Sequence, residues 1–340
     1  MSAQQAGSAE QAERPGPKQH PEQGGRRATF AALSANLVIA ATKFTAWALT
    51  GASSMLSEAI HSLADTGNQV LLLLGGRTAR RAPTPEHPLG FARQRYINAF
   101  LVSVILFSVG GCFALFEAWG KWGQIRAGLP DQLLESTWWW VPLLVIGISL
   151  VAEGLSLRTA VQESAQARGG HKLGWFIRHA KAPELPVVLL EDSAALFGLL
   201  FALLGIGLTL LTRNGIFDVV GSGLIGLLLI AVAVVLGIEM SSLLLGEAAE
   251  PDVTAAIQSA LADTPGVQGI IHLTALQAGP DQVTVAAKID VSPEQSAQQI
   301  AAVIDEAETR IRAAAPLVNQ IFLEPDIRRP DYVPHVQRTS

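Results

Sequence analysis

The chain has 340 residues, of which 49% are hydrophobic and only 16% are charged, whereas a soluble chain carries nearer about 25% charged residues. The composition therefore indicates a membrane protein. The formal net charge of -5 leaves no excess of basic residues to neutralise phosphates, which argues against nucleic acid as a partner, and the single cysteine, Cys112, excludes both an intramolecular disulfide framework and a zinc cluster built on cysteines.

The first 28 residues are rich in Gln, Gly, Pro and charged residues and contain almost nothing apolar to bury. We predict a disordered N-terminal tail over 1–28, because ordering it would not be repaid by burial. Apolar runs begin at Thr29, and a helix that crosses a bilayer needs about 20 such residues. We predict six transmembrane helices, over 29–50, 54–76, 96–119, 137–157, 185–211 and 216–245.

The connections between these helices differ in charge. Basic residues concentrate in the loops over 77–95 and 158–181, and few lie in the connections on the opposite side. Because Lys and Arg are retained in the cytoplasm, both termini are expected to be cytoplasmic.

After the membrane domain, 29–246, the sequence becomes typical of a soluble domain. Residues 247–326 follow the order helix, strand, strand, helix, strand, which predicts a small cytoplasmic α+β domain of the αββαβ, ferredoxin-like kind. Residues 327–340 are predicted to be a C-terminal tail. The fold class is thus an α-helical membrane protein with an appended α+β domain.

The second span contains Glu58, His61 and Asp65 within an otherwise apolar helix. At 100° per residue they lie within about 60° of one another, on one helix face. Such groups are costly in hydrocarbon unless they face the bundle interior, a water cavity or an ion, so we interpret them as functional. In the structural alternative, Glu58 is solvated while His61 and Asp65 bond to each other.

The fifth span carries Glu191 and Asp192 inside its apolar run. Adjacent positions differ by 100°, so only one of the two shares a face with the second span. We favour Asp192 as a ligand and Glu191 as a flanking group. An imidazole with two or more carboxylates suits a divalent first-row metal, and the alternative is proton or sodium binding without a metal.

One cation, Lys43, also lies inside a span, the first. It would be costly there without a partner. Three explanations are equally open: it neutralises an acid on a neighbouring helix, it snorkels outwards, or it borders a water cavity.

The spacing His61-x-x-x-Asp65, the loop segment His87-Pro88-Leu89-Gly90-Phe91-Ala92-Arg93, the six spans and the αββαβ domain together resemble the cation diffusion facilitator family. The resemblance implies a homodimer that exports Zn²⁺ or a similar ion from the cytosol in exchange for protons. It also implies a metal site between the second and fifth helices, with His61, Asp65 and Asp192 in the positions of family ligands.

The chain departs from the family pattern at Val188, where relatives with a four-ligand zinc site carry His or Asp. Glu191, Glu58, Asn68 or water must then complete the coordination. This donor set shifts the balance towards Mn²⁺, Fe²⁺ or Co²⁺, although Zn²⁺ remains the first choice.

Two further family sites are expected to be missing. Thr84 and Phe91 stand where relatives carry metal ligands around His87, and the cytoplasmic domain has too few histidines for a cluster. His272 is therefore expected to be structural, and the domain is expected to serve dimerisation.

The predicted function is proton-coupled export of a divalent metal, by a protein that is not an enzyme and has no prosthetic group. The expected partners are the metal ion, protons, the lipid bilayer and a second copy of the chain. The alternatives are a non-transporting metal sensor or scaffold and an intramembrane metalloenzyme. A bacterial cytoplasmic (inner) membrane is the expected location, because no targeting segment is recognised.

Overall fold

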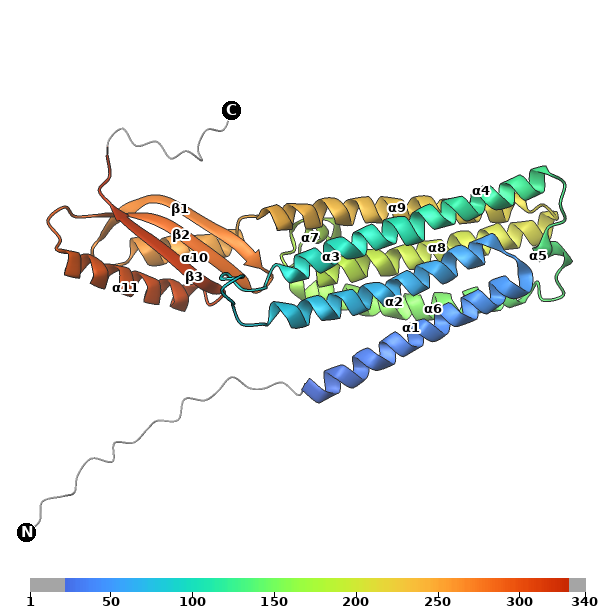
Figure 1. The fold of residues 1–340 in the computed structure, drawn as a ribbon, viewed down its shortest axis with the longest axis horizontal. Helices are drawn as coiled ribbons and strands as arrows, with labels where there is room; N and C mark the ends of the chain where they lie inside the picture. The colour runs from blue at the N-terminus through green and yellow to red at the C-terminus, as the bar shows by residue number, and fades with distance from the viewer. Residues whose placement is uncertain (1–21, 330–340) are drawn as a thin grey trace, which may run out of the picture.

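The structure is a computed structural model that describes residues 22–329. A long bundle of helices is followed by a small α+β domain at one end (Figure 1). The tails predicted over 1–28 and 327–340 fall largely outside the described residues, although helix α1, Glu22–Thr50, begins within the first of them. We call the end of the bundle that lies farthest from the α+β domain, near α5 (Gln132–Glu135), the outer end (Figure 1).

Long helices make up the bundle. They are α1, α2 (Ser53–Ala79), the continuous segment of α3 (Gln94–Ile105), the π-helix η1 (Leu106–Cys112) and α4 (Phe113–Arg126), then α6 (Val141–Ala167), α8 (Glu184–Thr212) and α9 (Ile216–Leu245). The short helices α5 (Gln132–Glu135) and α7 (Leu173–His179) lie in the connections.

By length and composition, four of the described helical segments can cross a membrane: Gln94–Arg126, Val141–Ala167, Glu184–Thr212 and Ile216–Leu245. Helices α1 and α2 are of similar length, and polar side chains interrupt the apolar sequence of α2. The predicted architecture of long membrane helices is confirmed.

Small residues allow α8 and α9 to pack closely. A Cβ atom added to Gly221 of α9 would lie 2.9 Å from the carbonyl oxygen of Phe201 and 3.3 Å from the Cα atom of Gly205, both on α8. Lipid tails are as apolar as leucine, so helices in a bilayer associate through such close backbone packing. The backbones of α8 and α9 are therefore in direct contact at Gly205 and Gly221.

At the outer end, Asp218 of α9 binds the beginning of α2. Its carboxylate accepts hydrogen bonds from the backbone N–H groups of Ser53 and Ser54, at 2.8 and 3.3 Å, and from both serine hydroxyls. These are the first two residues of α2, whose N–H groups have no partner within their own helix. A carboxylate there also meets the positive end of the helix dipole.

Lys121 of α4 completes this outer polar knot. Its Nζ atom lies 2.6 Å from Asp218 Oδ2 and 3.6 Å from Asp131 Oδ1, and it donates to the carbonyl oxygen of Gly51 at 3.3 Å. Asp218 is fully buried, and Lys121 is nearly so. The knot therefore ties α2, α4 and α9 together, with Lys121 as its buried cation.

The α+β domain consists of α10 (Pro251–Ala262), β1 (Val267–Gly279), β2 (Gln282–Val291), α11 (Ala297–Ala314) and β3 (Val318–Asp326). The sheet order is β1-β2-β3, with β1 and β2 antiparallel and β2 and β3 parallel. Alternate side chains of β2 are buried with residues of both helices in one apolar core. The predicted αββαβ order is confirmed.

Polar contacts join the two domains. The linker after α9 pairs with β1 through Ala248 and Leu276. Arg95 of α3 forms ion pairs with Glu184 at 2.5 Å and with Asp281 at 2.6 Å, so it bridges α8 and the β1–β2 turn. The α+β domain is thereby attached to the N-terminal ends of α3 and α8.

A second ion pair at this junction joins Lys181 to Glu247, with Nζ 2.5 Å from Oε2. Partial burial favours the protonated carboxyl, but the hydrogen bond from Lys181 prevails and lowers the pKa of Glu247. The contribution of Glu247 to stability is therefore fully present above the ordinary glutamate pKa of about 4.3 and is lost as the pH falls through the lowered pKa of the folded state.

The outer polar knot predicts a stability effect. Asp218→Ala removes the carboxylate nearest to the buried Lys121 and leaves only the more distant Asp131, and breaking a buried ion pair typically costs about 3–5 kcal/mol. We expect a clear fall in the thermal unfolding temperature of the purified protein, measured by intrinsic fluorescence. The exposed change Glu163→Ala on α6 serves as the control, and equal unfolding temperatures for the two variants would contradict the structural role of Asp218.

Candidate metal site

The polar face of α2 is buried inside the bundle. His61 is fully buried, and its Nδ1 atom lies 3.5 Å from Asp65 Oδ1, one helical turn further along. Neither ring nitrogen of His61 has a hydrogen-bond partner among the described residues, and Asp65 Oδ1 is likewise buried without one. Since buried polar atoms in native proteins are nearly always bonded, this face is suited to receive a ligand.

The two acids of α8 contact different helices. Asn68 of α2 donates a hydrogen bond to Glu191 Oε1 at 2.7 Å. Ser156 of α6 donates one to Asp192 Oδ2, also at 2.7 Å. The sequence favoured Asp192 as the acid on the face towards α2, but in the structure Glu191 makes the hydrogen bond to that helix.

Lys43 of α1 lies in the same region. It is fully buried, its Nζ atom is 3.0 Å from Glu58 Oε2, and it donates a hydrogen bond to Ser62 Oγ at 2.7 Å. Of the three explanations open from the sequence, the structure confirms neutralisation of an acid on a neighbouring helix. Glu58 is equally buried and is not solvated at a helix end.

Glu153 of α6, which the motifs of the sequence do not single out, also lies near these side chains. It interacts electrostatically with Asp65, Asp192 and Lys43. Ser156, one turn further along α6, is the residue that holds Asp192. This turn of α6, from Glu153 to Ser156, is therefore next to the acid Asp192 of α8.

The types of donor atom here suit a divalent metal ion. The cluster offers one imidazole from His61 and carboxylates from Asp65, Glu191 and Asp192, which favour borderline and hard divalent cations. Within residues 22–329, no three His, Cys, Asp or Glu side chains converge into a complete metal-binding group. The ligand assignment of His61, Asp65, Glu191 and Asp192 thus stays a prediction.

Val188 contributes to packing at the place where a ligand was expected from the resemblance. Its side chain packs against an apolar cluster formed by Ala160, Phe176 and Leu189. A valine offers no donor atom, so any fourth ligand must come from another position.

The other histidines with suggestive positions have local contacts. The ring of His87 packs against that of Phe91, with centroids 4.6 Å apart. His272 Nε2 shares a hydrogen bond with the Thr274 hydroxyl at 2.9 Å. These contacts agree with structural roles for both residues.

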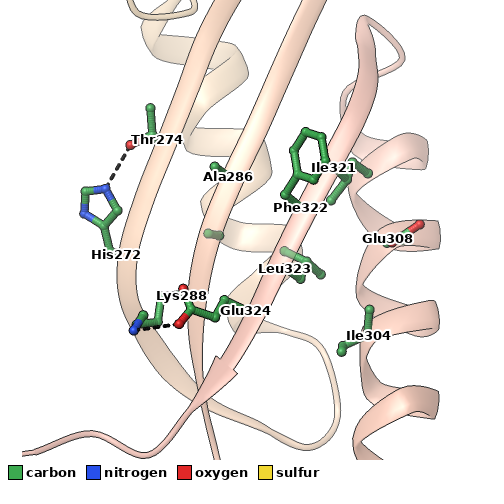
Figure 2. Close-up of a pocket in the computed structure, with 11 residues that line it drawn as sticks. His272, Thr274, Ala286, Lys288, Ile304, Glu308, Ile321, Phe322, Leu323 and Glu324 are labelled. Atoms are coloured by element: carbon green, nitrogen blue, oxygen red, sulfur yellow. Dashed lines mark hydrogen bonds and ion pairs between the residues drawn. The ribbon is translucent and has the colours of Figure 1, made fainter. Parts of the chain in front are cut away.

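The α+β domain has a pocket of about 580 Å³ between strands of the sheet and α11. Figure 2 draws the residues that line this pocket. His272 lies on one side of it, bonded to Thr274, and Lys288 forms an ion pair with Glu324 at 2.9 Å. Hydrogen bonds from Lys288 to Glu324 and Asp326 raise the pKa of the lysine. These polar groups are bonded to neighbouring side chains, unlike the two ring nitrogens of His61 on α2.

Comparison with known proteins identifies the class. Residues 29–245 match the family described as cation efflux transmembrane domain, and residues 249–325 match the one described as cation efflux protein, cytoplasmic domain. The chain therefore belongs to the cation efflux, or cation diffusion facilitator, family. This membership agrees with the prediction from the sequence of a cation transporter rather than an enzyme.

Individual relatives are named for metal transport. The chain is 36% identical over 250 residues to the proton-coupled zinc antiporter SLC30A9, mitochondrial, of Xenopus laevis, covering 73% of this chain and 43% of the relative. It is 28% identical over 280 residues to metal tolerance protein C4 of Arabidopsis thaliana, covering 82% of this chain and 59% of the relative. The chain thus spans less than two thirds of the length of these relatives.

A solved structure of a MamM CTD variant is 26% identical in sequence to this chain. The match covers 23% of this chain and 92% of that chain, with a TM-score of 0.22.

The relatives give no support to the expected bacterial cytoplasmic membrane, since the antiporter is named as mitochondrial. What holds is that the chain is an integral membrane protein.

The hydrogen bond from Asn68 leads to a prediction for metal affinity. Asn68→Ala removes the group that orients Glu191, and the loss of such a supporting contact typically weakens metal binding about 10- to 100-fold. Equilibrium binding of Zn²⁺ to the purified protein measures the change.

The matched control is Asn98→Ala. Asn98 of α3 is also buried and donates a hydrogen bond to α2, at the carbonyl oxygen of Leu71, but it lies outside the cluster. We expect it to lower stability without changing Zn²⁺ affinity. Equal affinities for both variants would show that Asn68 only packs helices.

Proposed function

We propose that the protein exports a divalent transition-metal ion, Zn²⁺ in the first place, in exchange for protons. The observation that supports this most strongly is the buried polar face of α2, where the unbonded ring of His61 lies near Asp65 and Asn68 binds Glu191 of α8. Ionisable groups at membrane depth mark ion and proton pathways.

The exchange follows from the chemistry of the donors. Metal ligands must be deprotonated, so the entry of a divalent cation among His61, Asp65, Glu191 and Asp192 releases protons. Protons that arrive from the other side of the membrane then displace the ion. The same side chains thus serve the metal and the protons in turn, in alternating access to the two sides.

The choice of metal follows from the same donors and from the relatives. One nitrogen and several oxygens accommodate Zn²⁺, and they also accept Mn²⁺, Fe²⁺ and Co²⁺. Zinc is named for the relative that is 36% identical. We therefore rank Zn²⁺ first and treat the other three ions as competing substrates.

The acting unit is a homodimer in a membrane that maintains a proton gradient. Residues 249–325 match a cytoplasmic domain whose family label refers to dimers, and this domain is attached to the ends of α3 and α8 by the ion pairs of Arg95. A relative is named as proton-coupled, which supports coupling to such a gradient.

Uptake into proteoliposomes tests the proposal. Metal is supplied outside vesicles with an acidic lumen, for Zn²⁺, Mn²⁺, Fe²⁺ and Co²⁺ in turn. We expect wild-type uptake that a protonophore abolishes, and uptake near that of protein-free vesicles for Asp65→Ala and Asp192→Ala, because each removes a carboxylate of the site.

The exposed change Glu163→Ala provides the control and is expected to transport like the wild type. Uptake that ignores the pH gradient would refute the proton coupling. If the folded wild-type dimer takes up none of the four metals, the chain is not the transporter proposed, and a sensor or scaffold becomes the better explanation.

A further inference from the structure

The two carboxylate oxygens of Glu58 differ, because one is paired with Lys43 and the other has no hydrogen-bond partner among the described residues. On the bound side, Oε2 lies 3.0 Å from Lys43 Nζ, with both side chains fully excluded from the surface. Its other oxygen, Oε1, is buried and has no hydrogen-bond partner in the described part of the chain. A buried charged group normally uses all of its acceptor capacity, so a free oxygen here requires an explanation.

The free oxygen faces α8. A Cβ atom added to Gly198 of α8 would overlap Glu58 Oε1, so the glycine leaves room for the carboxylate between the two helices. Gly198 is on the same helix as Glu191 and Asp192, further towards the outer end. Glu58 Oε1 therefore points into the same α2–α8 interface as the predicted metal ligands.

The unbonded atoms form a row along α2. Glu58, His61, Asp65 and Asn68 each carry at least one buried polar atom without a partner among residues 22–329. Their spacing of three, four and three residues places them on one helix face, over a rise of about 15 Å. Glu58 lies at the outer end of this row, one turn beyond His61, because α2 begins at the outer end.

Lys43 is placed so that it can exchange with a cation at Glu58. Its ammonium group is held by Glu58 and Ser62, and it acts electrostatically on His61, Asp65 and Glu153 as well. A divalent ion and an ammonium group repel each other strongly in a medium of low dielectric constant. An ion that moves outwards from His61 towards Glu58 therefore weakens the hold of Glu58 on Lys43.

We propose that Glu58 is a further metal-binding residue, which takes the ion from His61 and Asp65 on its way out, and that Lys43 is its internal counter-cation. The lysine neutralises Glu58 when no metal is there, gives way when the ion arrives, and re-forms the ion pair when the ion leaves. Re-pairing removes a ligand from the departing ion and so favours release to the outer side. This inference rests on the proposed transport function.

The test separates metal loading from metal release. Glu58→Gln keeps the shape of the side chain and removes its charge, so we expect Zn²⁺ binding to the purified protein to change by less than about threefold. Uptake into proteoliposomes is expected to fall at least about tenfold, because a residue that acts after loading affects the rate more than the ground-state affinity.

A second variant tests whether the only role of Glu58 is to neutralise Lys43. Lys43→Met with Glu58→Met replaces both charges by apolar groups, a change that buried ion pairs often tolerate without loss of stability. If Glu58 only neutralises Lys43, this double variant transports like the wild type, and the proposal is overturned. We expect it to fold normally and to transport as slowly as Glu58→Gln.

The control is Glu239→Gln, which removes a partly buried acid from α9 outside the cluster and is expected to leave both readouts unchanged. Wild-type uptake by Glu58→Gln overturns the role of Glu58 alone and leaves the antiport proposal standing. Absence of metal uptake by the wild type itself refutes the proposed function, and the role of Glu58 with it.

Discussion

A membrane interior offers no partners to polar groups, and this constraint governs the helical domain. Every charged side chain inside the bundle must be paired by another part of the protein or must serve an ion. The chain meets this requirement in two ways at two levels of the bundle. At the outer end the acid Asp218 is completely bonded, whereas along the polar face of α2 several buried atoms remain without a partner within residues 22–329.

The outer polar knot serves stability, whereas the polar face of α2 serves the proposed function. Both oxygens of Asp218 accept hydrogen bonds, from the start of α2 and from Lys121, so the outer polar knot fixes α2 relative to α4 and α9. With its beginning held, α2 presents His61 and Asp65 in a defined direction, two to three turns along the helix. The bundle tolerates the unbonded polar atoms of α2 because the outer polar knot and the close packing of α8 against α9 stabilise the helices around them.

The sequence predicted the membrane helices, the αββαβ domain and the polar positions of α2 and α8, because these depend on composition, periodicity and local spacing. The sequence alone did not predict which residues of distant segments contact each other. Periodicity showed that Lys43 needs a partner but not that Glu58 provides it, and it did not single out Glu153 of α6 as a neighbour of Asp65. The rotation of α8, which directs Glu191 and not Asp192 to Asn68, depends on packing with α6 and α9.

The central claim is that His61 and the neighbouring carboxylates hold the transported ion, and X-ray absorption spectroscopy of the Zn²⁺-loaded protein tests it most directly. The account predicts a first shell with a single imidazole nitrogen at about 2.0–2.1 Å and otherwise oxygen ligands. In His61→Ala the nitrogen contribution should disappear while oxygen ligands remain. A shell with several imidazoles, or a nitrogen signal that survives in His61→Ala, would contradict the account.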